Sequence, residues 1–440
     1  FEGFCNHHSL LRTAPRGKEQ LPDSMGRGGM MDVRGKQDSL LVCTDGPKAY
    51  VWKSVNALFF SNYLNLLMLC TPFAVLARQH GSDGVIFAFS LLAIAPFAER
   101  LSFVTEQLAL HTNETLGGLL NATFGNVTEL IVSMFAIKAG LLRIVQVSLL
   151  GSILSNLLLV LGCAFFFGGL RYQHQTFNKT ACSLNSGMLM ISVMSLLFPT
   201  VLQQTHTEIA PSSVLWVSRW VSVLLLCTYC AYLVFQLHTH RHIFEDSKEP
   251  TDGAEDGDEE EEDEDDEEAV LGMWGAVFWL AVITVFVAFL SEFMVDALEG
   301  AAKDWGVPKL FLGTIVIPIV GNAAEHAAAI IFACKNKMEL ALGIAVGSST
   351  QIAMFVVPLC VVIAWGYDIP LSLDFHPFET CTLLLTVVLV AFLIQHGESN
   401  WLQGLMLVVA YCIVSMGFFV HCDQNGEADG CPTWPAADEL

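Results

Sequence analysis

Gly125-Asn126-Val127-Thr128-Glu129 and Gly321-Asn322-Ala323-Ala324-Glu325 are the two stretches that decide how this chain folds. Each places a helix-breaking Gly-Asn pair, and then a carboxylate, in the middle of an apolar run. An ionisable side chain at bilayer depth is costly unless it is paired, hydrated or neutralised, so it indicates a functional site. Because the pattern occurs twice, we expect two equivalent halves of one site.

The composition is that of a polytopic membrane protein. Of the 440 residues, 53% are hydrophobic and only 15% are charged, whereas soluble domains carry about 25% charged residues. The net charge of −23 is mostly local, because residues 245–268 hold 17 acids and one Lys and so contribute −16. The rest of the chain has a net charge of −7. No basic region indicates binding to nucleic acid, so we expect no nucleic-acid partner.

Apolar runs along the chain predict about eleven transmembrane helices, because each run is long enough to cross a bilayer. The predicted fold is an all-α membrane protein with one first helix and two inverted repeats of five helices. The predicted segments are a mobile N-terminal tail (1–50), a first transmembrane helix (51–80), a first repeat (81–240), an acidic cytosolic insert (241–270), a second repeat (271–420) and a C-terminal tail (421–440). The eight Lys and Arg residues before the first span favour a cytosolic N-terminus.

The two repeats are visible as constant spacings. Glu129 and Glu325 are separated by the same interval as Gly151-Ser152 and Gly347-Ser348. Upstream of these, each repeat carries two glutamates spaced by two helical turns, Glu99 and Glu106 in the first and Glu292 and Glu299 in the second. Since five is an odd number of spans, successive copies enter the membrane from opposite sides. Such inverted repeats place their site near the midplane, on interrupted helices. An old duplication kept only for packing would explain the matched glycines but not the matched acids.

Oxygen-bearing side chains accompany both stretches and suit a hard divalent cation, which takes about six to eight oxygens. The predicted ligands are Asn126, Glu129, Ser152, Ser155, Asn322, Glu325, Ser348 and Gln351. Thiols and imidazoles do not dominate this set, which favours Ca²⁺ or Mn²⁺ over Zn²⁺ or copper. The two carboxylates carry two negative charges, which one divalent ion or two protons neutralise. Ca²⁺ is therefore expected as a transported substrate exchanged for H⁺, and no cofactor is expected.

Other titratable side chains have two interpretations each. Glu106 and His326, with Glu129 and Glu325, are predicted to couple proton movement, although His326 could equally be a packed neutral histidine. Glu99, Glu292 and Glu299 are predicted to line a vestibule, and the alternative is an ion pair such as Glu99 with Arg100. The acidic run Asp256–Glu268 either is a solvated segment or collects Ca²⁺ at the cytosolic mouth.

At these residues the chain resembles the CAX family of vacuolar cation/proton exchangers, within the Ca²⁺/cation antiporter superfamily. The resemblance covers about residues 50–420 and rests on the two Gly-Asn motifs, on Gly-Ser-Ile-Leu-Ser-Asn from Gly151 and on Gly-Ser-Ser-Thr-Gln from Gly347. It implies one extra helix followed by two inverted five-helix repeats, with Glu129 and Glu325 as the central metal- and proton-binding carboxylates. It also implies a cytosol-side position for Glu106.

The resemblance further implies a multi-pass protein of a vacuolar or similar acidic-organelle membrane, with Ca²⁺, H⁺ and the lipid bilayer as partners. The oligomeric state is left open, a homo-oligomer included. A Na⁺-coupled Ca²⁺ exchanger is the alternative, and a Ca²⁺ channel is a further one. The usual catalytic motifs, such as H-E-x-x-H, G-x-S-x-G and a Walker A sequence, are absent from the sequence, so we expect a transporter rather than an enzyme.

Overall fold

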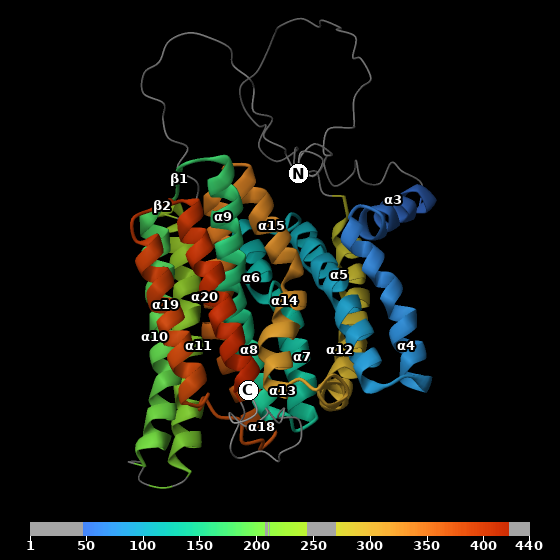
Figure 1. Ribbon diagram of the computed structural model, residues 1–440. Coiled ribbons are helices and arrows are strands. Elements are labelled where there is room, and N and C mark those ends of the chain that lie inside the picture. Colours follow the sequence, from blue (N-terminus) through green and yellow to red (C-terminus); the bar gives the residue numbers. More distant parts are fainter. Residues whose placement is uncertain (1–46, 207–209, 211, 244–269, 422–440) are drawn as a thin grey trace, which may run out of the picture. The chain divides into compact units, whose positions relative to one another are not determined.

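The computed structural model describes residues 47–206, 210, 212–243 and 270–421, and these are almost entirely helical (Figure 1). The elements up to the acidic insert are α3 Pro47–Phe59, η1 Tyr63–Leu69, α4 Cys70–His80, α5 Asp83–Ala109, α6 Glu114–Phe124, α7 Val127–Lys138, α8 Leu142–Leu154, η2 Ser155–Val160, α9 Leu161–Arg171, β1 Gln175–Thr176, α10 Lys179–Thr205, α11 Ser213–Val234, η3 Phe235–Thr239 and η4 Arg241–Ile243.

The elements after the insert follow the same order. They are α12 Met273–Trp305, α13 Lys309–Phe311, η5 Leu312–Val316, α14 Ile317–Gly321, α15 Ala323–Cys334, α16 Met338–Leu342, η6 Gly343–Gly347, α17 Ser348–Gln351, η7 Ile352–Val356, α18 Val357–Gly366, α19 Pro377–Ile394, β2 Glu398–Ser399 and α20 Trp401–Val420. The two short strands pair antiparallel, Gln175 opposite Ser399.

The described residues confirm the predicted class of an all-α membrane protein. Among the described residues, eight helices are long and apolar enough to cross a membrane, or ten if each of two bent pairs counts as one span, so the predicted count of about eleven is not confirmed. One bent pair is Lys309–Gly321 with Ala323–Cys334, which turn by 52° at the second Gly-Asn pair. The other lies in the predicted first span, where Trp52–Phe59 and Tyr63–His80 meet at 92°. The helix that begins this segment therefore runs across, and not along, the helix that follows it (Figure 1).

The internal repeat of the sequence recurs in the helix boundaries. α7 and α15 are equally long and begin directly after the two Gly-Asn pairs, at Val127 and Ala323. α8 and α16 begin at Leu142 and Met338, which are separated by the same interval as Val127 and Ala323. Wide π-helical turns interrupt both of the long helices that follow, as η2 in the first and as η6 and η7 in the second. Such turns occur frequently at functional sites.

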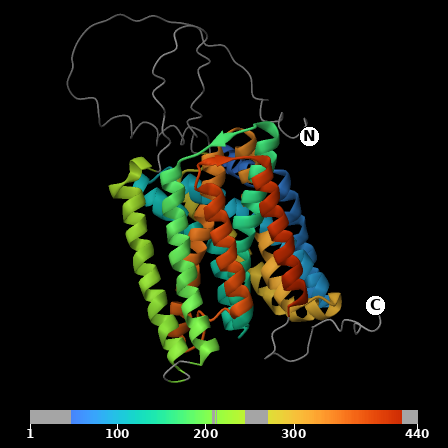
Figure 2. The same ribbon diagram turned by 60° about the vertical axis from the view of Figure 1, so that its left-hand side comes forward.

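The two halves are packed together through helix pairs that each combine one element from either side of the insert. These pairs are α5 with α12, α9 with α20, α10 with α19, α9 with α15 and α11 with α18. The long helices run alongside one another in both views (Figures 1 and 2). Very close contacts between the halves require glycine: a Cβ on Gly404 of α20 would lie 2.2 Å from the backbone nitrogen of Phe166.

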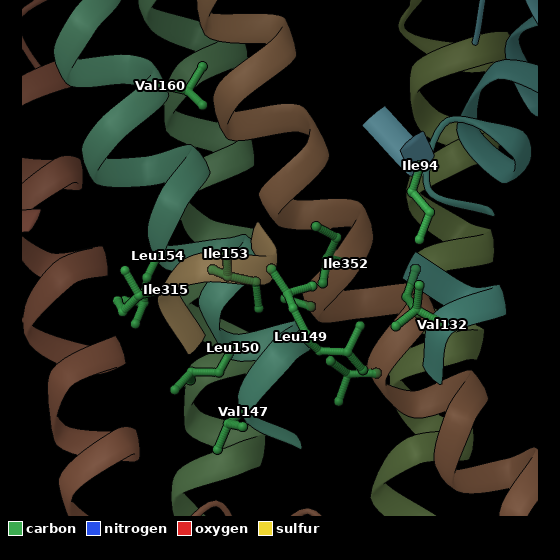
Figure 3. Close-up of a cluster of buried hydrophobic side chains, with 14 of the residues drawn as sticks. Ile94, Val132, Val147, Leu149, Leu150, Ile153, Leu154, Val160, Ile315 and Ile352 are labelled. Carbon is green, nitrogen blue, oxygen red and sulfur yellow. The ribbon is translucent and has the colours of Figure 1, made fainter. Parts of the chain in front are cut away.

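The core is centred on α8, which is buried along most of its length. Its side chains Leu149, Leu150 and Ile153 belong to one apolar cluster with residues of η5 and η7, and the close-up shows them with Ile315 and Ile352 (Figure 3). Large side chains on the outer helices are exposed, among them Trp216, Leu224 and Ile413. An apolar exterior of this kind suits contact with lipid.

Candidate cation site

Both Gly-Asn pairs break their helices in the same way. The backbone of Asn126 has φ −115° and ψ 21°, and that of Asn322 has φ −93° and ψ 20°. Neither asparagine side chain caps its own helix, so both amides are available for contacts elsewhere. Glu129 and Glu325 then occupy the first turns of α7 and α15. The amino-terminal end of a helix favours negative charge.

The two carboxylates lie close enough to interact electrostatically, although they belong to different repeats of the sequence. One oxygen of Glu325, Oε2, is buried and accepts no hydrogen bond within the described part of the chain. A buried carboxylate oxygen without a donor is costly unless a cation or a proton satisfies it. The structure therefore brings together two acids that need a positive partner.

A cavity of about 30 Å³ adjoins Glu129, which is room for one or two water-sized particles. Its polar lining comes from α7, α8 and the break before α15, and consists of Thr128, Glu129, Ser148, Ser152 and Asn322. The rest of its wall is apolar and includes Leu91, Ile94 and Met294. The polar side chains come from both repeats, so the cavity combines oxygen ligands with an apolar wall.

Several predicted ligands are hydrogen-bonded to other polar side chains. Asn126 Nδ2 donates to Gln351 Oε1 at 2.6 Å, and Asn322 Nδ2 donates to Asn156 Oδ1 at 3.3 Å. Ser155 is fully buried, and Ser348 is half-buried; neither lines the cavity. Among the described residues, no three His, Cys, Asp or Glu side chains group in a way that could hold a metal ion. A site here would thus use two carboxylates and neutral oxygens.

A larger cavity of about 520 Å³, which we call the vestibule, is lined by Phe177 and Asn178, directly after β1, and extends to Gln351. Its lining includes Glu106, Asn185, Tyr232, Glu339 and Gln351. Glu106 belongs to this lining; its cytosol-side position and its part in proton coupling remain predictions. Gln351, in the vestibule lining, is hydrogen-bonded to Asn126 at the first helix break.

The other predicted acids have basic partners. Glu99 pairs with the neighbouring Arg100, Lys138 Nζ lies 4.0 Å from Glu292 Oε1, and Lys309 Nζ lies 2.8 Å from Glu299 Oε1. None of the three acids lines the vestibule, and a role for them in ion access stays a prediction.

His326 lies directly beyond Glu325, and its Nδ1 is 2.6 Å from the backbone oxygen of Asn322. Its Nε2 is buried without a hydrogen bond in the described residues. The ring thus contacts the backbone at the helix break of Asn322. A part for His326 in proton coupling remains a prediction.

Sequence reasoning overlooked Thr128, Ser148 and Asn156. Ser148 lies one helical turn before Ser152, so the i, i+4 spacing was the available signal. Thr128 lies inside the first motif itself. Asn156 ends the Gly-Ser-Ile-Leu-Ser-Asn motif, but its contact with Asn322, 166 residues away, could not be inferred from a local pattern.

Comparison with known proteins defines the class. The sequence matches the family described as sodium/calcium exchanger protein over residues 83–238 and 275–420. The chain therefore belongs to this family of membrane exchangers, and the expected resemblance to vacuolar cation/proton exchangers is confirmed.

Within that class, particular relatives are similar over nearly the whole chain. Vacuolar cation/proton exchanger 5 of Arabidopsis thaliana is 48% identical over 423 residues, which cover 95% of this chain and 94% of that protein. Vacuolar cation/proton exchanger 2 of Arabidopsis thaliana is 51% identical over 86% of each chain. Among solved structures, the Ca²⁺/H⁺ antiporter protein YfkE is 36% identical, with a TM-score of 0.67 over 81% of this chain and 99% of its own.

Proposed function

We propose that the protein is a secondary antiporter that exchanges Ca²⁺, or a related divalent cation such as Mn²⁺, for H⁺. The observation that carries this proposal is the pair Glu129 and Glu325, which occupy equivalent first turns after the two helix breaks, with Glu129 and the second break lining one cavity. One Ca²⁺ or two protons would neutralise the pair, and the two loads would compete for the same oxygens. The empty charged pair remains costly to bury, so only a loaded site would change sides.

The direction of Ca²⁺ transport and the membrane that holds the protein are also part of this proposal, which is supported by the similarity to vacuolar cation/proton exchangers. We expect Ca²⁺ to move from the cytosol into an acidic, vacuole-like lumen, because the proton gradient there can drive uphill accumulation. The vestibule, with Glu106 in its lining, would be the cytosolic mouth, and the N-terminus would be cytosolic. The chain would perform transport, with no covalent chemistry on a substrate.

Uptake into proteoliposomes tests the proposal. Purified protein in acid-loaded vesicles should accumulate ⁴⁵Ca²⁺ in Na⁺-free medium, and a protonophore should abolish this accumulation. A pH dye inside the vesicles should report loss of protons in step with Ca²⁺ uptake. Uptake that requires a Na⁺ gradient would instead identify a Na⁺-coupled exchanger. Ca²⁺ flux without proton movement would identify a channel, and either result would overturn the proposal.

A further inference from the structure

Arg143 and Glu339 are equivalent residues of the two repeats. The interval between them in the sequence is the one that separates Glu129 from Glu325. Each is the second residue of its helix, because α8 begins at Leu142 and α16 at Met338. Neither was singled out in the sequence, since a charged residue near a helix end is normally exposed to water or lipid headgroups.

Arg143 binds a buried acid of the other repeat. Its Nη2 lies 2.7 Å from Oε1 of Glu379, in the first turn of α19. The Glu379 side chain is fully buried, and His421 Nε2 is 3.6 Å from the same oxygen. The second oxygen, Oε2, accepts no hydrogen bond among the described residues. A buried carboxylate in this condition depends strongly on its basic partner.

A second contact strengthens this connection. Arg143 Nη1 donates to Gln146 Oε1 at 3.0 Å, and Gln146 Nε2 donates to the backbone oxygens of Ser372 and Asp374 at 2.9 and 3.0 Å. The segment that precedes α19 is in turn tied to the outer helices, because Phe375 N donates to Thr200 Oγ1 of α10 at 3.2 Å. The start of α8 is thus connected to α19 and, through the segment that precedes α19, to α10.

Glu339 makes the equivalent contact at the other end of the molecule. Its Oε1 accepts from the backbone N–H of Asn178 at 2.6 Å. Asn178 caps α10, because its Oδ1 accepts from the backbone nitrogens of Thr180 and Ala181. The start of α16 is therefore bound to the start of α10, as the start of α8 is bound to the start of α19.

We propose that Arg143 and Glu339 are positioning residues, which anchor the two long helices of the cation site to the opposite repeat and so hold Ser152, Ser348 and Gln351 in place. Each anchor crosses between repeats, α8 to α19 and α16 to α10. Ser152 and Ser348 both follow their anchors by about nine residues, or about 14 Å along a helix. An anchored first turn sets both the rotation and the height of the side chains that follow it.

The test rests on the proposed function, and its first arm exchanges the buried pair. Arg143→Glu and Glu379→Arg, singly, should raise the Ca²⁺ concentration for half-maximal uptake about tenfold or prevent folding, because each leaves two like charges facing one another. The double variant restores an opposite pair, and we expect its half-saturating concentration within about threefold of wild type. A purely structural contact would lower yield and melting temperature without shifting that concentration in the protein that folds.

The second arm uses Glu339, which lines the vestibule and has a conservative replacement. Glu339→Gln keeps an oxygen for the Asn178 N–H, so half-saturation should stay within about twofold of wild type, whereas Glu339→Ala should raise it about tenfold. Glu398→Ala, an exposed acid at the same end of the molecule, is the matched control and should change nothing. If Glu339→Gln is as impaired as Glu339→Ala, the carboxylate acts by its charge in the vestibule, and the anchor proposal is wrong.

The two proposals fail differently in this experiment. Wild-type protein without proton-driven Ca²⁺ uptake would overturn the exchanger assignment, and the anchor proposal with it. Normal wild-type uptake with unchanged half-saturation in Glu339→Ala, or with no recovery in the double Arg143/Glu379 variant, would overturn the anchors alone.

Discussion

Glu129 and Glu325 owe their chemistry to position more than to residue type. Each acid lies in the first turn of the helix that begins after a Gly-Asn break. The amino-terminal end of that helix favours its negative charge. The two acids come from different repeats and lie within electrostatic range of each other. Burial and mutual repulsion oppose that charge. Because these effects oppose each other, the site is most stable when one divalent ion or two protons neutralise the two carboxylates.

Neutralising either acid should therefore stop exchange. Glu129→Gln and Glu325→Gln each leave a single carboxylate, so one divalent cation would no longer be matched in charge. We expect proton-driven ⁴⁵Ca²⁺ uptake to fall to the level of protein-free vesicles, with the protein still present in the membrane by immunoblot. Near-normal uptake by either variant would remove these residues from the site.

The hydrogen bond between Asn126 and Gln351 should contribute a smaller amount. Gln351→Ala removes the 2.6 Å acceptor of Asn126 Nδ2, at a cost of about 1 kcal/mol, or roughly a fivefold higher half-saturating Ca²⁺ concentration. The exposed Gln395 provides a matched control, and Gln395→Ala should leave the concentration unchanged. Equal behaviour of the two variants would show that the Asn126 contact does not support the site.

At the scale of elements, α8 determines how closely the halves approach. A Cβ on Gly151 would lie 2.1 Å from the backbone oxygen of Thr314 in η5, a distance that no side chain tolerates. The same stretch of α8 also supplies Ser148 and Ser152 to the cavity. Close packing and site lining are thus combined on adjacent faces of one helix.

Gly151→Ala should consequently lower stability. Forcing a methyl group into packed backbone typically costs about 1–3 kcal/mol, and we expect a lower melting temperature of the detergent-solubilised protein. Gly187→Ala on α10 is the matched control, because a Cβ there meets nothing within 4 Å and alanine is the better helix former. If Gly151→Ala and Gly187→Ala have the same melting temperature, the close packing at Gly151 is contradicted.

At the scale of the whole molecule, the arrangement of cavities and cross-repeat helix pairs suits alternating access. α5 and α12 form one extensive pair, and both contribute to the cavity wall, through Leu91, Ile94 and Met294. The large vestibule lies on one side of Asn126 and Gln351, whereas the small cavity adjoins Glu129.

The sidedness of the chain in the membrane is a prediction from the sequence, from its basic N-terminal tail and its odd number of predicted spans. The predicted topology places the segment between α11 and α12 on the side of the N-terminus and the C-terminus on the opposite side. An epitope inserted at residues 245–268 should be digested by protease added outside intact vacuoles, whereas one placed after Leu440 should be protected. Digestion of both tags, or of the C-terminal tag alone, would contradict the orientation.

Sequence alone determined the class, the two repeats and the two broken helices, because hydropathy, helix-breaking Gly-Asn pairs and a constant interval between matched motifs are local or periodic features. It also indicated Glu129 and Glu325, since acids inside apolar runs are conspicuous. Only the tertiary structure decided which residues meet: Asn126 with Gln351, Asn322 with Asn156, and Arg143 with Glu379. These partners are 166 to 236 residues apart, and their contacts depend on how the repeats pack, which no local pattern encodes.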